Sequence, residues 1–347
     1  MRVSIKSAEF GTTPEGLRVD RHIIANAAGM RAHILTYGAS LHALEVPDAA
    51  GRLLDVAMGF GDLEGYRNYA GYNGQIVGRF ANRIAGAAFT LDGRRYEVTA
   101  NEKGINCLHG GGEFSHAVWQ TREAGGNSVL LYYFSRDSSH GFPGNLHATV
   151  RYTLSDEGGL LLEYEAFADK DTVISMTNHT YFNLAGQNGG DILSHELYIN
   201  ADTYLPTDGN NIPLAQPAVV GGTPFDFRKP KLIGRDIADG THQTAKCGGY
   251  DQNFCLNGGP GPAVSVRCPE SGIRMDIQTD LPGVQLYTGN FLNGAPGKGG
   301  RPLEKHAGFC LETQYYPDSP NRPDFPSCVF KAGEHYRSKT SFLFSTV

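Results

Sequence analysis

Two neighbouring segments, His147–Leu154 (HATVRYTL) and Leu160–Ala168 (LLLEYEAFA), carry the pattern that decides the fold. They are short, they are rich in branched and aromatic residues, and apolar positions alternate with polar ones. That alternation is the period of a half-buried β-strand. Further runs of the same character are His33–Tyr37, Ala87–Leu91, Ser128–Ser135, Glu196–Ala201, Ala263–Cys268, Ile273–Thr279, Gly283–Gly289 and Ser341–Phe344.

Glycine and proline, with 45 and 18 residues, separate these runs at short intervals. Asp92-Gly93 predicts a hairpin across Thr90–Tyr96, because both residues tolerate the positive φ of a type I′ turn. Pro47–Arg52 predicts a longer hairpin loop. Only Asp62–Asn68 and Leu232–Asp239 could hold a turn or two of helix. Strands do not alternate with long helices, so the sequence predicts an all-β fold, one large antiparallel β-sandwich over residues 1–347 with few short helices.

Composition narrows the functional classes. The chain has 347 residues, 40% of them hydrophobic, which is enough for a sizeable core. A formal charge of −6 argues against a nucleic-acid partner, which calls for a basic surface. We expect neither a signal peptide nor a membrane span, since no long apolar run occurs. A cytoplasmic location is therefore expected.

The six cysteines do not suggest a metal or disulfide framework. No Cys-x-x-Cys pair and no His-Glu-x-x-His occurs, so we predict no metal site. The chain is long and lacks an apparent export signal, which favours reduced thiols. The cysteines are Cys107, Cys247, Cys255, Cys268, Cys310 and Cys328.

Three ionisable residues stand inside apolar, strand-like runs: His109, His179 and Glu312. Burying such groups costs several kcal/mol unless they are paired, which suggests that the three share one cleft. An imidazole acid and a carboxylate base are the groups that move protons. Each histidine could instead be a hydrogen-bonded core residue, and Glu312 could be the ion-pair partner of Arg79 or Arg83.

Two glycine-rich segments superficially suggest other chemistry. Leu108–Gly112 (LHGGG) is similar to the oxyanion turn of esterases, but the Gly-x-Ser-x-Gly sequence that this reading needs is missing. Gly297–Gly300 (GKGG) lacks the spacing and the Ser or Thr of a phosphate-binding loop. By contrast, Gly248–Phe254 places Asp251 among amides and aromatic rings, which is typical of sugar sites and equally of a plain turn.

Taken together, the motifs resemble the aldose 1-epimerase, or galactose mutarotase, family over nearly the whole chain. Each motif is weak alone, but their order along the chain is specific. The motifs are Gly78–Ile84 (GRFANRI), Leu108–Gly111 (LHGG), Gly141–Leu146 (GFPGNL), Asn178–Leu184 (NHTYFNL), Gly249–Asp251 (GYD), Pro282–Thr288 (PGVQLYT) and Leu311–Gln314 (LETQ).

This resemblance implies a β-sandwich with a sugar cleft on a concave face. It implies that Glu312 is the catalytic base and His179 the catalytic acid. By the same match, the sugar is bound by His109, Asp251, Arg83, Asn82 and Gln285. One departure is visible, because Gln252 stands where the family usually has histidine, which puts the sugar preference in doubt.

The implied activity is isomerisation: α and β anomers of a free hexose such as galactose or glucose interconvert by ring opening and reclosure. A carboxylate near His179 is expected to raise the pKa of that histidine and keep it charged. No cofactor is expected, the implied partner is a small monosaccharide, and the chain should be a monomer or homodimer. A phosphosugar 1-epimerase and a non-catalytic carbohydrate-binding or sensing domain are the alternatives.

Overall fold

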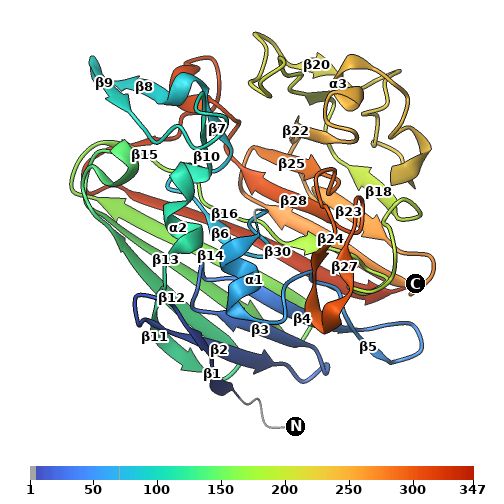
Figure 1. The fold of residues 1–347 in the computed structure, drawn as a ribbon. Helices are drawn as coiled ribbons and strands as arrows, with labels where there is room; N and C mark the ends of the chain where they lie inside the picture. The colour runs from blue at the N-terminus through green and yellow to red at the C-terminus, as the bar shows by residue number, and fades with distance from the viewer. Residues whose placement is uncertain (1–4, 70) are drawn as a thin grey trace.

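The computed structural model describes residues 5–69 and 71–347 and is built mainly from β-strands (Figure 1). In the three large sheets all neighbouring strands are antiparallel. The longest helix within the described residues is α1 (Leu63–Asn68), and the side chain of Asp62 caps its N-terminus; α2 (Glu113–His116) and α3 (His242–Ala245) are single turns. The predicted all-β sandwich is confirmed.

The largest sheet has nine strands and forms one layer of the sandwich (Figure 1). Burial alternates residue by residue along β13, so one face packs on the core and the other faces outward. Its strands, in spatial order, are β11 (Gln120–Gly125), β12 (Ser128–Ser135), β13 (Leu146–Leu154), β14 (Gly159–Ala168), β30 (His335–Thr346), β24 (Ile273–Thr279), β23 (Val264–Arg267), β18 (Glu196–Ile199) and β21 (Lys231–Leu232).

A six-stranded sheet behaves differently, because its central strands are buried on both faces. One face packs on the core, and the opposite face is covered by loops. The order is β17 (Tyr181–Phe182), β28 (Phe309–Gln314), β25 (Gly283–Tyr287), β22 (Asp251–Cys255), β19 (Thr203–Tyr204) and β20 (Ala218–Val219). Polar residues on that second face are therefore candidates for function.

A five-stranded sheet from the N-terminal part of the chain completes the large sheets. The predicted Pro47–Arg52 loop joins its last two strands, and the Asp48 carboxylate accepts hydrogen bonds from the backbone N–H groups of Ala50 and Arg52. The strands are β1 (Lys6–Thr12), β2 (Arg18–Ala25), β3 (Arg31–Leu35), β4 (Leu41–Pro47) and β5 (Leu53–Asp55).

One hydrophobic core joins the three sheets. The ring of Phe182 in β17 lies 5.4 Å from the ring of Phe342 in β30, which ties the six-stranded sheet to the nine-stranded one. The Tyr152 hydroxyl in β13 donates to the carbonyl of Ala39, just before β4, at 2.7 Å. Large apolar side chains thus hold the layers together, and a few buried polar groups fix their alignment.

Within the described residues, five short two-stranded sheets accompany the three large sheets. The predicted Asp92-Gly93 hairpin is confirmed, with positive φ at both residues. The segment Leu232–Asp239, which could hold a turn or two of helix, holds one 3-10 turn, η4 (Ile233–Arg235). The pairs are β6 (Ile76–Val77) with β16 (Thr177–Asn178), β7 (Arg83–Ile84) with β10 (Cys107–Leu108), β8 (Ala88–Leu91) with β9 (Arg94–Glu97), β15 (Thr172–Val173) with β29 (Val329–Phe330), and β26 (Ala295–Pro296) with β27 (Pro302–Leu303).

Lys298, from the glycine-rich segment that suggested a phosphate loop, has a structural role. Its ammonium group is buried and donates to the Asp55 carboxylate at 2.6 Å and to the carbonyls of His42 and Ala57. These bonds tie the loop of the β26–β27 hairpin to the five-stranded sheet. In the described part of the chain, no helix is both long and apolar enough to cross a membrane.

Candidate active site

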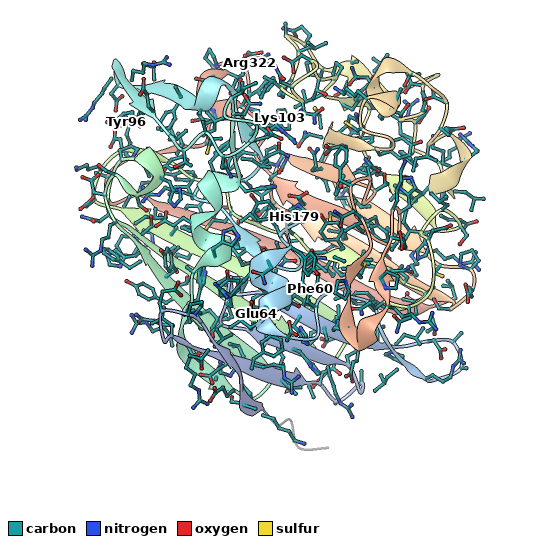
Figure 2. All side chains as sticks on the ribbon, in the orientation of Figure 1. Phe60, Glu64, Tyr96, Lys103, His179 and Arg322 are labelled. Atoms are coloured by element: carbon teal, nitrogen blue, oxygen red, sulfur yellow. The ribbon has the colours of Figure 1, made fainter. Side chains whose placement is uncertain are left out.

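A cleft of about 700 Å³ lies over the second face of β22, β25 and β28. Its size is within the range of small-molecule sites. Asp251, Gln285 and Glu312 line it from the sheet, and loops from both halves of the chain form its walls. In the view of Figure 2, His179 lies between Lys103 and Phe60, and all three residues line the cleft.

Glu312 reaches the cleft because of the period of its strand. In β28, Phe309 and Leu311 point into the core, so Cys310 and Glu312 point to the opposite face. Glu312 is only 2% exposed and lies beside Gln285 in the register of β25 and β28. Its Oε2 has no hydrogen-bond partner within the described residues. A buried carboxylate with a free oxygen is suited to accept a proton from a ligand.

His179 occupies the two-residue break between β16 and β17, and the strand expected there is interrupted. Its backbone N–H donates to Gln75, and its carbonyl accepts from Gly74, both at 2.9 Å. The ring of Tyr181 packs 5.2 Å from the imidazole ring. Backbone bonds and ring packing thus fix the direction of the side chain.

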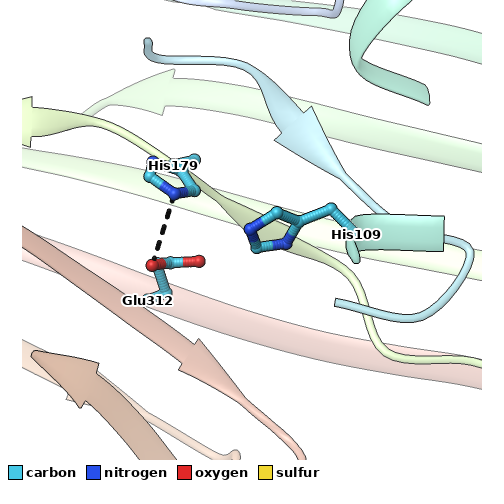
Figure 3. A group of neighbouring side chains, drawn as sticks. All are labelled: His109, His179 and Glu312. Carbon is cyan, nitrogen blue, oxygen red and sulfur yellow. Dashed lines mark ion pairs between the residues drawn. The ribbon is translucent and has the colours of Figure 1, made fainter. Parts of the chain in front are cut away.

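The structure brings His179 and Glu312 together. Nε2 of His179 lies 3.5 Å from Oε1 of Glu312, as the dashed line in Figure 3 shows. The partner of Glu312 is therefore His179, and neither arginine considered from the sequence takes that place. On the other side of the ring, Nδ1 of His179 lies 3.5 Å from the buried thiol of Cys310. Burial raises the pKa of that thiol well above its ordinary value, so it stays protonated.

Burial dominates the protonation of this pair. The pKa of Glu312 is raised from 4.5 to about 8, mainly by burial and in smaller part by the nearby Asp251, while Arg83 acts to lower it. Burial also lowers the pKa of His179 from 6.5 to about 4. The expectation that a neighbouring carboxylate keeps His179 charged is wrong, because desolvation of the imidazolium is the larger effect. Between these values the pair holds one proton, and Glu312 carries it.

His109 begins the 3-10 turn η2 (His109–Gly112) instead of lying in a strand. Its ring lies 5.2 Å from that of His179. Nδ1 of His109 accepts a hydrogen bond from the backbone N–H of Asn82 at 3.1 Å. Burial holds the pKa of His109 well below its ordinary value, so the ring is neutral and its proton is on Nε2. His109 is therefore a fixed donor to the cleft.

The glycine after His109 allows this arrangement. A Cβ on Gly110 would lie 2.2 Å from the carbonyl oxygen of Gly78 and 2.4 Å from the nitrogen of Arg79. The segments LHGGG and GRFANRI, which are far apart in sequence, therefore pack backbone against backbone. Arg79 itself is fully buried away from the cleft and donates to Pro143, Gly144 and Ser135.

The three ionisable groups also raise the possibility of a metal site. Ligand atoms of His109, His179 and Glu312 all lie within 4.8 Å of one another. A metal bound by Nε2 of His109 would need the lone pair of that nitrogen. The bond from Asn82 puts the lone pair on Nδ1 and the proton on Nε2. The cluster thus offers a hydrogen-bond donor where a metal needs a ligand.

Arg83 and Asn82 form a second wall of the cleft. The Arg83 guanidinium makes a two-point ion pair with Glu102, with Nε and Nη2 at 3.0 and 2.8 Å from its oxygens. The Asn82 side-chain oxygen accepts from the Arg83 backbone N–H at 2.9 Å. Glu102 thus orients Arg83. The two residues are 19 positions apart, and no sequence pattern identified Glu102 as the partner of Arg83.

Asp251 and Gln285 support each other on the sheet. Nε2 of Gln285 donates to Oδ1 of Asp251 at 2.7 Å. Gln252 follows Asp251 in β22, so its side chain points to the other face; it donates to the carbonyl of Gln243 and accepts from the Asp251 backbone N–H. The residue that departs from the family pattern therefore anchors β22 to α3 and does not line the cleft.

All seven residues that the sequence singled out thus line one cleft, and their chemical roles stay predictions. Sequence reasoning missed three other lining residues, Glu102, Tyr72 and Asn73, and also Cys310, which lies behind His179. Tyr72 packs 4.7 Å from His109 and 5.8 Å from His179. Only Cys310 had a signal in the sequence, since it lies two residues before Glu312 in a strand.

The chain is similar to known proteins over nearly its full length. The family model described as aldose 1-epimerase matches residues 20–343. The galactose mutarotase of Bos taurus is 43% identical over 347 residues, covering 99% of each chain. The aldose 1-epimerase of Escherichia coli (strain K12) is 37% identical and covers 95% of this chain and 96% of its own. The crystal structure of galactose 1-epimerase from Lactobacillus acidophilus NCFM has a TM-score of 0.88 at 27% identity, covering 99% of each chain.

An all-β sandwich of this kind, together with these relatives, defines the class: the chain is an isomerase with a galactose mutarotase-like fold. More narrowly, it belongs to the aldose 1-epimerase family, whose model it matches over nearly its full length. The predicted family resemblance is confirmed.

Proposed function

We propose that this chain interconverts the α and β anomers of a free hexose such as galactose or glucose, with Glu312 as base and His179 as acid. One observation carries the assignment: the two groups stand 3.5 Å apart on the floor of a cleft of sugar-binding size. The O1 hydroxyl and the ring oxygen of a pyranose are bonded to the same carbon. An acid and a base that serve both oxygens must therefore stand close to each other.

Ring opening needs two proton transfers. Glu312 takes the proton of the O1 hydroxyl while His179 gives a proton to the ring oxygen, and the C1–O5 bond breaks to leave an aldehyde. C1 then turns about the C1–C2 bond, and the reverse transfers close the ring on the other carbonyl face. Each transfer can contribute on the order of 10²–10⁴ in rate.

The single proton of the pair can sit on either group. The structure favours the proton on Glu312, because burial disfavours both charges. A bound sugar offers a hydroxyl donor to a carboxylate and a ring-oxygen acceptor to an imidazolium. Binding therefore favours the charged form that the reaction needs, without any proton entering from solvent.

The aldehyde intermediate must stay in the cleft while C1 turns. The Nε2–H of His109, the Arg83 guanidinium, the amide of Asn82 and the Asp251–Gln285 pair offer hydrogen bonds to its hydroxyls. Aromatic rings of Tyr181, Tyr287 and Phe291 also line the cleft and suit the C–H faces of a sugar.

Polarimetry tests this proposal directly. We expect the protein to speed the change in optical rotation of freshly dissolved α-D-galactose and α-D-glucose well above the buffer rate. A calorimetric titration that shows tight sugar binding, with no change in that rate, would establish the non-catalytic alternative. The acid–base pair argues against that alternative, because binding alone does not require two ionisable groups in contact.

Phosphosugars should be poor substrates. Arg79 is buried away from the cleft, Arg83 is paired with Glu102, and the Lys246 ammonium is bonded to Thr207 and to the carbonyl of Asp208. These three cations are already engaged, and the other cleft-lining lysine, the exposed Lys103, stands alone, so the described residues form no cluster of free cations for a phosphate. We expect kcat/KM for glucose 6-phosphate, corrected for its uncatalysed rate, to be at least tenfold below that for glucose. A ratio above one would reverse the assignment.

The pH dependence should follow the shared proton. Below about pH 4 the pair takes up a second proton and has no base; above about pH 8 it loses its only proton and has no acid. We therefore expect kcat/KM to be bell-shaped, with limbs near these values. The measurement is polarimetry at constant ionic strength with the buffer rate subtracted at each pH. A single limb near 6.5, the value of an unperturbed histidine, would contradict the shared-proton scheme.

A further inference from the structure

Asn73 carries a hydrogen-bonding capacity that the fold does not use. Its side chain is 2% exposed and lines the cleft, and neither its oxygen nor its nitrogen has a partner in the described part of the chain. A side-chain amide can donate twice and accept twice. Leaving such a group buried and unpaired is costly, and an apolar residue of similar size would avoid that cost.

The backbone around Asn73 is held rigidly next to His179. Gln75 N–H donates to the Tyr72 carbonyl at 3.0 Å, which closes a tight turn with Asn73 inside it. Gly74 N–H donates to the His179 carbonyl, and the Gly74 carbonyl accepts from Asn178. The backbone of Asn73 is therefore fixed beside the segment that carries His179.

The position of the amide places it on the substrate side. A Cβ on Gly71 would lie 3.1 Å from Oδ1 of Asn73 and 3.5 Å from the Tyr181 hydroxyl, so both polar groups border the same small space. Oε1 of Gln285 and Oε2 of Glu312 are also buried, unpartnered and in this cleft. These polar atoms, which have no partner within the described residues, suit a ligand with several hydroxyl groups.

We propose that Asn73 is a specificity-determining residue that binds a pyranose hydroxyl other than O1. Its Oδ1 accepts the hydroxyl proton while its Nδ2 donates to a hydroxyl oxygen, on one hydroxyl or on two neighbouring ones. The proposal deepens the proposed function, on which it rests. O1 is left to Glu312, which removes its proton.

The test pairs a variant with deoxy sugars. Asn73→Leu removes the amide at similar volume, and kcat/KM is measured for D-galactose and for its 2-, 3-, 4- and 6-deoxy forms. We expect about a tenfold loss for galactose, expressed mainly in KM, which is the size of one neutral hydrogen bond. For the deoxy sugar that lacks the bound hydroxyl, kcat/KM should already be low with the wild type. The Asn73→Leu substitution should not lower that value further.

The matched control is Asn293→Leu, the same change at an exposed asparagine at the cleft mouth, which should leave all five values unchanged. Thermal melting checks the fold, and Asn73→Ala repeats the panel if Asn73→Leu does not fold. An equal loss for galactose and every deoxy sugar, or no loss at all, overturns the proposal.

The experiment also separates this proposal from the proposed function. If the wild type speeds mutarotation but Asn73→Leu shows no selective loss, only the role of Asn73 fails. If the wild type speeds none of these sugars, the proposed function fails. Calorimetric titration of the same sugars into both proteins then decides the role of Asn73, and the absence of any sugar binding overturns it too.

Discussion

The Glu312→Gln variant should lose nearly all mutarotase activity and keep its fold. Glutamine has almost the shape of glutamate but cannot take the proton of the O1 hydroxyl. Loss of a positioned base lowers kcat by roughly 10²–10⁴. Polarimetry of fresh α-D-galactose measures the loss. The same substitution at the exposed Glu304 is the control and should keep wild-type activity.

Stability separates this chemical effect from unfolding. Because burial raises the pKa of Glu312 from 4.5 to about 8, the folded chain holds this proton more tightly than the unfolded chain. Through this group, the stability of the wild type falls as pH rises between those values. The variant has no such proton to lose, so at pH 9 its melting temperature should equal or exceed that of the wild type. Full activity would remove Glu312 from the mechanism.

The His179→Asn variant should lose nearly as much activity as Glu312→Gln, with kcat lower by roughly 10²–10⁴. Asparagine can donate a hydrogen bond to the ring oxygen but cannot transfer a proton to it. When the C1–O5 bond breaks, the ring oxygen would then become an alkoxide that receives no proton. Because the loss is in the chemical step, KM should change much less than kcat.

A nearby histidine provides the control for this variant. His116 lies 6.2 Å from the ring of Tyr72 but does not line the cleft, so His116→Asn should retain activity within about twofold. Circular dichroism checks that both variants are folded. If His179→Asn turns over galactose at the wild-type rate, another group protonates the ring oxygen, and the role given to His179 is wrong.

Much of the fold follows from local pattern. Alternation in HATVRYTL and LLLEYEAFA predicted β13 and β14 almost to the residue, and Asp92-Gly93 predicted the β8–β9 hairpin, because period and turn chemistry are properties of a few adjacent residues. The segment Leu232–Asp239 forms one 3-10 turn, at the short end of the turn or two of helix expected from the sequence.

The electrostatics of the site could not be read from the chain. The sequence predicted that a neighbouring carboxylate keeps His179 charged. In the fold both groups lose their water, and desolvation reverses the order of their pKa values. Likewise Gln252 seemed a candidate for sugar selectivity, but strand alternation turns it away from the cleft.

By itself the sequence determined the strand content, the family and the kinds of side chain available for acid–base chemistry, because these depend on residue type and order. Only the tertiary structure decided that His179 meets Glu312 at 3.5 Å, that Glu102 orients Arg83, and that Asn73 is left without a partner. Such contacts join segments far apart in sequence, and their energies depend on how much water the surrounding fold excludes.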